Sequence, residues 1–181
     1  LNIVSNNLPN YWNETASKFI SFGYGISISP ISLATSFSTL VNGGVKVQPT
    51  IFLGQNNLTE RIIKYQTSKK INILLQKIVE NGTGKKAKVS GLKVGGKTGT
   101  SEKIVEGNYN REKVITSFIG VFPIDKPKYL TLVLFDEPKR KSERFLEYFG
   151  GDTAAPTFSK IVQKISPILN IENYLKNMAV N

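Results

Sequence analysis

The sequence predicts an α+β fold in which helices pack on an antiparallel sheet. Apolar residues recur with helical spacing over 29–44 and 68–81, and again in a segment that begins near Thr153. Between the second and third of these helices the period changes. Three segments there are rich in β-branched and aromatic residues and are predicted to be strands: 94–101, 114–122 and 129–136. Their short connections, roughly 103–112 and 123–128, allow only antiparallel hairpins, so helices and sheet are segregated along the chain.

The first long helix, over 29–44, has the clearest start and stop signals. Ser29 can cap it, Pro30 suits its first position, and the glycine pair 43–44 ends it. Its apolar stripe consists of Leu33, Ala34, Phe37, Leu40 and Val41. A short helical turn is expected before it, at 14–19.

The other two helices are predicted from their apolar faces. The helix over 68–81 ends before Gly82, and its expected buried residues are Ile71, Leu74, Leu75, Ile78 and Val79. The helix that begins near Thr153 is expected to bury Phe158, Ile161, Val162, Ile165 and Ile168. Asp136 and Glu137, which end the last strand, are expected to be solvated.

Composition excludes several kinds of chemistry. The 181 residues are 40% hydrophobic and 20% charged, which is typical of a globular domain. The absence of cysteine and histidine rules out disulfides, thiolate catalysis and a Ser-His-Asp triad, and leaves no ligands for a typical zinc site. The net charge of +11 comes mostly from scattered lysines, with only four arginines. Nucleic-acid sites more often cluster arginine with aromatic residues, so no nucleic-acid partner is expected.

The strongest local motif is the hexapeptide Gly95–Thr100 on a predicted strand. Alternation puts the hydroxyls of Thr98 and Thr100 on one side, and with the nearby Lys97 they would make a receptor for a carboxylate. Gly99 lets another backbone approach closely, and a strand N–H could donate to a developing oxyanion. The hexapeptide alone is equally consistent with a glycine-weakened strand that leads into an ordinary turn.

Residues 91–98 also match the G-x-x-x-x-G-K-T pattern of a phosphate-binding loop. That interpretation needs a hydrophobic strand before Gly91 and a helix that begins near Lys97. Residues 81–90 are polar and lysine-rich, and Gly99 follows immediately. Nucleotide binding is therefore disfavoured.

Four stretches resemble signature segments of class B penicillin-binding proteins, in that family's order. They are Ser21–Ile26 followed by Ser29–Ala34, then Gly82–Ala87, Lys97–Thr100 and Gly150–Phe158. Together they span the chain from about Trp12 to Ile171. Residues 1–181 thus resemble the C-terminal portion of a penicillin-binding transpeptidase domain, with greatest similarity to the cell-division type.

This resemblance implies the fold shared by penicillin-binding transpeptidases and serine β-lactamases, with an antiparallel sheet flanked by helices. It implies a peptidoglycan D,D-transpeptidase that cross-links stem peptides ending in D-Ala-D-Ala and is acylated by β-lactams. Lys97 would supply positive potential and assist proton transfer, Thr98, Gly99 and Thr100 would bind substrate, and the Thr100 N–H would form half of the oxyanion hole.

The resemblance also bears on partners and location. No cofactor or metal is expected. Cell-division proteins are expected partners of the parent protein, and the expected location is the periplasmic face of the bacterial inner membrane, with an N-terminal anchor outside this sequence.

The family's nucleophile is a serine in Ser-x-x-Lys, accompanied by Ser-x-Asn. Ser90–Lys93 fits the first pattern but abuts the Lys97 strand, and Ser5–Asn7 fits the second but lies too close to Ser21. The catalytic serine is therefore expected upstream of Leu1. The alternative is a non-catalytic interaction or sensor module that keeps the fold without the nucleophile.

Overall fold

The computed structural model describes residues 5–21, 23–54, 58–139 and 149–171. The chain divides into two compact units, Leu1–Lys69 and Lys70–Asn181, each described here by itself. Of the segments that carry the resemblance, Phe22 lies outside the described residues.

The first unit contains two helices and a small two-stranded sheet. Its elements are α1 (Glu14–Ser21), α2 (Pro30–Val41), β1 (Val45–Val47) and β2 (Leu58–Arg61). The start of α2 is as predicted, because the Ser29 hydroxyl accepts a hydrogen bond from the Ser32 N–H at 3.2 Å and Pro30 is the first helical residue. The antiparallel pair β1–β2 is not predicted by the sequence.

Helix α3 (Tyr65–Asn81) begins three residues earlier than predicted. The buried Ser68 hydroxyl donates to the Leu40 carbonyl at 2.5 Å and accepts from the Gly43 N–H at 3.0 Å. Leu75 and Val79 are buried as expected, whereas the prediction for Leu74 is wrong, since this side chain is 60% exposed.

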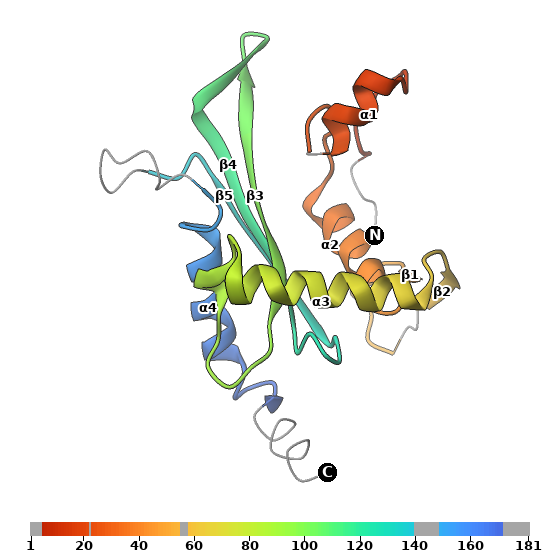
Figure 1. Ribbon diagram of the computed structural model, residues 1–181, viewed down its shortest axis with the longest axis vertical. Coiled ribbons are helices and arrows are strands. Elements are labelled where there is room, and N and C mark those ends of the chain that lie inside the picture. Colours follow the sequence, from red (N-terminus) through yellow and green to blue (C-terminus); the bar gives the residue numbers. More distant parts are fainter. Residues whose placement is uncertain (1–4, 22, 55–57, 140–148, 172–181) are drawn as a thin grey trace. The chain divides into compact units, whose positions relative to one another are not determined.

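The second unit is built on an antiparallel sheet with strand order β3-β4-β5, as Figure 1 shows. The strands are β3 (Gly95–Val105), β4 (Asn108–Phe122) and β5 (Tyr129–Asp136). All three predicted strands are confirmed, and the bounds of β5 match the prediction. The first connection is much shorter than predicted. Only Glu106 and Gly107 turn the chain, with φ of 51° and 81°, and positive φ at both positions matches the twist of a hairpin.

Helix α4 (Ala154–Ile165) packs on one face of this sheet. The Phe158 ring meets Phe118 and Phe122 edge-on, with centroids 4.9 and 5.9 Å apart. Val162 is also buried, as predicted. The prediction is wrong for Ile161 and Ile168, which are 36% and 78% exposed, and Ile168 lies beyond the end of the helix.

Helix α3 approaches the opposite face. A Cβ at Gly95 would lie 3.2 Å from the Gln76 main-chain nitrogen, and Gly95 pairs with the buried Val121, whose side chain points away from α4. Helix α4 therefore covers one face of the sheet, and α3 lies close to the sheet at Gly95, the first residue of β3.

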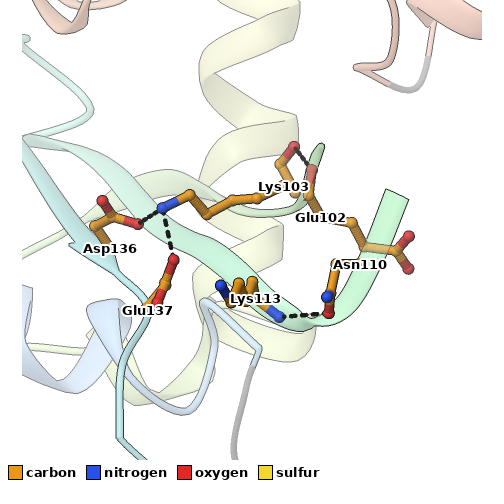
Figure 2. Close-up of polar contacts among 7 residues, drawn as sticks. Glu102, Lys103, Asn110, Lys113, Asp136 and Glu137 are labelled. Atoms are coloured by element: carbon orange, nitrogen blue, oxygen red, sulfur yellow. Dashed lines mark hydrogen bonds and ion pairs between the residues drawn. The ribbon is translucent and has the colours of Figure 1, made fainter. Parts of the chain in front are cut away.

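Lys103, in the distal part of the β3–β4 hairpin, forms ion pairs with two carboxylates at the end of β5. The Lys103 ammonium lies 2.9 Å from Asp136 and 2.7 Å from Glu137, just after a register shift between Glu102 and Lys103 (Figure 2). Hydrogen bonds to Glu137 and to Asp136 raise the pKa of Lys103 above its ordinary value. The expectation that the two carboxylates are simply solvated is thus incomplete, because both are ion-paired.

Candidate functional site

Strand β3 carries all four predicted site residues at the edge of the sheet. Lys97, Thr98, Gly99 and Thr100 pair with residues 119 to 116 of β4. Within the described part of the chain β3 pairs only with β4, so its outer edge keeps backbone N–H and C=O groups that no neighbouring strand uses. Such an edge can accept an extended peptide or donate to an oxyanion.

Thr98 and Thr100 open into one cavity of about 340 Å³ in the second unit. Both side chains lie on the α4 face of β3, as alternation predicts, because their cross-strand partners are Phe118 and Thr116. The cavity is lined by Thr83, Lys85, Lys86, Thr98, Thr100, Phe149, Gly150, Gly151 and Asp152. Its size is at the lower end of the range for small-molecule sites.

The cavity walls are held together by two hydrogen bonds. The hydroxyls of Thr83 and Thr98 lie 3.0 Å apart, and the Gly150 N–H donates to the Thr100 hydroxyl at 3.0 Å. Thr83 belongs to the turn that precedes the 3-10 helix η1 (Lys85–Ala87). The two bonds connect this turn, the strand and the segment before α4.

The glycine pair before α4 allows close approach. A Cβ at Gly150 would lie 2.5 Å from the Gly99 carbonyl oxygen, and a Cβ at Gly151 would lie 2.5 Å from that of Thr83. No side chain fits at such distances, so glycine at both positions lets this segment cross β3 and close one end of the cavity.

Lys97 lies apart from the two threonine hydroxyls. It pairs with Ile119, which places its side chain on the opposite face of β3, and its ammonium donates to the Thr98 carbonyl at 2.8 Å. The structure therefore brings together Thr98 and Thr100, and it does not bring Lys97 into their cavity.

Two lysines for which the sequence predicts no role also line the cavity. Lys85 and Lys86 are the first two residues of η1, directly after the turn that contains Thr83, and Lys86 forms an ion pair with Asp152 at 2.8 Å. The signal was present in the segments 82–87 and 150–158, which resemble family signatures. Nothing in the sequence indicates that these two segments meet.

Ser90–Lys93 and Ser5–Asn7, the two segments that fit the family's serine patterns, have ordinary structural roles. Ser90 and Gly91 form a turn between the bridged residues Val89 and Leu92, and Lys93 pairs with Asp125 at 3.3 Å. A serine nucleophile of this family would stand at the start of a helix, which this turn is not.

Ser5–Asn7 has an ordinary structural role as well, and the structure contradicts the nucleotide-binding alternative. The Asn6 side-chain oxygen accepts from the Ser29 N–H at 3.2 Å and supports the approach to α2. Lys97 and Thr98 lie inside a strand rather than at a helix start, which contradicts the phosphate-binding-loop interpretation.

Residues 2–163 match the family model described as the penicillin binding protein transpeptidase domain. The chain is 36% identical over 176 residues to a probable peptidoglycan D,D-transpeptidase FtsI of Caulobacter vibrioides, covering 91% of this chain and 30% of that protein. It is 34% identical over 165 residues to the stage V sporulation protein D of Bacillus subtilis, covering 84% and 25%.

A solved structure is similar as well. The apo transpeptidase domain of Burkholderia pseudomallei penicillin-binding protein 3 superposes with a TM-score of 0.76 at 30% identity, over 88% of this chain and 48% of that one. The chain thus spans a quarter to a third of the two named relatives and about half of this solved chain. Among the helices of the described residues, none has the length and apolar character needed to span a membrane.

Proposed function

Because this chain belongs to the penicillin-binding protein transpeptidase domain family, we propose that its parent protein is a serine-type peptidoglycan D,D-transpeptidase and that residues 1–181 supply the β3 side of the active site. The observation that carries the proposal is the edge strand β3, with the Thr98 and Thr100 hydroxyls opening into a small cavity. The similarity to the probable peptidoglycan D,D-transpeptidase of Caulobacter vibrioides supports the reaction type.

The proposed reaction is an acyl transfer in two steps. A serine oxygen attacks the carbonyl carbon of the penultimate D-alanine, the bond to the terminal D-alanine breaks, and that residue leaves with the proton that the serine gave up. An amine of a neighbouring stem peptide then attacks the ester, which forms the cross-link and returns the serine. A β-lactam would acylate the same serine.

In this proposal each residue of β3 has its own task. The Thr98 and Thr100 hydroxyls donate to the terminal carboxylate of the substrate, and Gly99 leaves room for the substrate backbone. The Thr100 N–H donates to the oxyanion. Lys97, on the other face of the strand, supplies positive charge where the serine and its proton acceptor would lie.

The nucleophile is proposed to lie outside these 181 residues. The turn geometry of Ser90 supports this, because a serine needs a base within hydrogen-bond reach and Lys93 is engaged by Asp125. A periplasmic location at the inner membrane and contact with cell-division proteins are proposed for the parent on the family resemblance.

Labelling of the full-length gene product with a fluorescent penicillin tests the proposal. We expect one covalent adduct on a serine and release of D-alanine from a stem-peptide substrate. A correctly folded full-length protein that forms no adduct and releases no D-alanine would contradict the proposal and favour a non-catalytic module with the same fold.

A further inference from the structure

The cavity beside Thr98 and Thr100 has a surplus of hydrogen-bond donors. Thr83 and Thr98 share one hydrogen bond, which uses one of their two hydroxyl hydrogens and leaves the other. The Thr100 oxygen accepts from the Gly150 N–H, so its own hydrogen also stays available. The cavity can therefore offer two O–H donors to a ligand.

The residues that line the cavity carry a net positive charge, which suits an anionic ligand. Its lining residues include two lysines, Lys85 and Lys86, and one acidic residue, Asp152. Lys86 and Asp152 neutralise each other in an ion pair of 2.8 Å. Among the described residues Lys85 has no ion pair, so its charge is the uncompensated one. Two hydroxyl donors and one free ammonium make a receptor for a single anionic group.

The position of Lys97 leaves this receptor without another cation from β3. The Lys97 side chain is on the opposite face, with its ammonium on the Thr98 carbonyl. If the Thr98 and Thr100 hydroxyls bind a carboxylate, the lysine of the cavity lining that has no ion pair among the described residues is Lys85.

We propose that Lys85 binds the carboxylate of the acyl donor, together with the hydroxyls of Thr98 and Thr100, and that the Lys86–Asp152 ion pair keeps the Asp152 carboxylate from repelling it. The proposal rests on the proposed function and names a further substrate-binding residue for the same site. The ligand class is a D-Ala-D-Ala peptide with a free C-terminal carboxylate, or a β-lactam with its ring carboxylate.

The test compares acylation rate constants of the full-length protein for two probes, benzylpenicillin and its methyl ester, which lacks the negative charge. We expect Lys85→Gln to slow acylation by benzylpenicillin about tenfold, a usual loss for one hydrogen bond to a charged group. With the methyl ester this variant should react at the wild-type rate, because the group that Lys85 binds is absent.

Two further variants make the result specific to charge at this position. Lys85→Arg should keep most of the wild-type rate with benzylpenicillin. Lys113→Gln removes an exposed lysine of β4 outside the cavity and should leave both rates unchanged. Circular dichroism verifies that each variant is folded.

The outcomes separate this inference from the function on which it rests. Equal rates for Lys85→Gln and Lys113→Gln with benzylpenicillin would overturn the role of Lys85 and leave the transpeptidase proposal intact. Slowing by the same factor with both probes would also overturn it, since the effect would not depend on the carboxylate. A wild-type protein that neither probe acylates would overturn the proposed function, and this inference with it.

Discussion

The hydroxyls of Thr83 and Thr98 lie 3.0 Å apart, which ties the turn before η1 to the edge strand β3. Near this contact Lys85 and Lys86 of η1 line the same cavity as the threonines of the strand. The strand therefore has two different faces, with the threonine hydroxyls and the η1 lysines on one and Lys97 on the other.

Replacing Thr98 and Thr100 together by valine tests the hydroxyl face. Valine keeps the branched shape and strand propensity but deletes both O–H donors, so acylation of the full-length protein by benzylpenicillin should slow by about tenfold or more. Loss of the Thr83–Thr98 hydrogen bond and of the Gly150–Thr100 hydrogen bond should lower the free energy of unfolding by about 1 kcal/mol each. Thr131→Val, on β5, is the control. A double variant that does not fold would show that these threonines are structural.

Lys97→Ala tests the other face. Since Lys97 is exposed and, among the described residues, its ammonium hydrogen-bonds only to the Thr98 carbonyl, the fold should be nearly unchanged. Removing a preorganised charge near the reacting groups should slow acylation by about a hundredfold. Stopped-flow measurement with a fluorescent penicillin gives the rate, with Lys113→Ala on β4 as the matched control. Wild-type reactivity of Lys97→Ala would exclude the role proposed for this residue.

Asp152→Asn should speed acylation, whereas the substitutions of Thr98, Thr100 and Lys97 should slow it. The substitution removes the negative charge of the cavity and frees Lys86, so the cavity becomes more positive while its shape is kept. Acylation of the full-length protein by benzylpenicillin should become a few-fold faster at low salt, and the gain should shrink as salt screens the charges. A slower reaction at low salt would contradict the assignment of this cavity to an anion.

The start of α2, the three strands of the larger sheet and the shared face of Thr98 and Thr100 are all predictable from the sequence. Their signals are local: a capping serine before proline, β-branched runs, and alternation along a strand. The errors arise where tertiary contacts decide. The helix predicted to begin near Ser68 begins at Tyr65, and Ser68 hydrogen-bonds to Leu40 of α2, while Leu74 lies on an exposed face of the helix.

The lining of the cavity is a second case in which contacts between distant parts of the chain are not predictable from the sequence. Lys86 and Asp152 are 66 positions apart in the sequence, and no local pattern pairs them. Alternation alone predicts the face of Lys97, although its proximity to the threonines along the chain suggests a shared receptor. The structure separates them because neighbouring residues of a strand point to opposite faces.

The 181-residue chain by itself should form no stable adduct with a fluorescent penicillin. Acylation needs a serine with a base in reach, and Ser90 lies in a turn whose lysine is paired with Asp125. Intact-mass spectrometry after incubation decides this, with the full-length protein as the positive control. A mass increase of one β-lactam mapped to a serine of this chain would overturn the assignment of the nucleophile to another part of the parent.

The ion pairs of Lys103 predict a pH dependence of stability. Because Glu137 and Asp136 raise the pKa of Lys103 in the folded chain, their contribution is fully present below the ordinary lysine value of 10.5 and is lost as the pH rises through the folded value. Lys103→Gln should therefore be less stable than the wild type at about pH 8, and the difference should shrink above about pH 11. Denaturant unfolding of the 181-residue chain at both pH values measures it. The control Lys113→Gln removes a lysine from the same hairpin that forms no ion pair among the described residues, so its difference from wild type should be small at both. A stability difference for Lys103→Gln that stays constant across this range would mean that the ammonium charge contributes nothing and that Lys103 acts through its aliphatic chain.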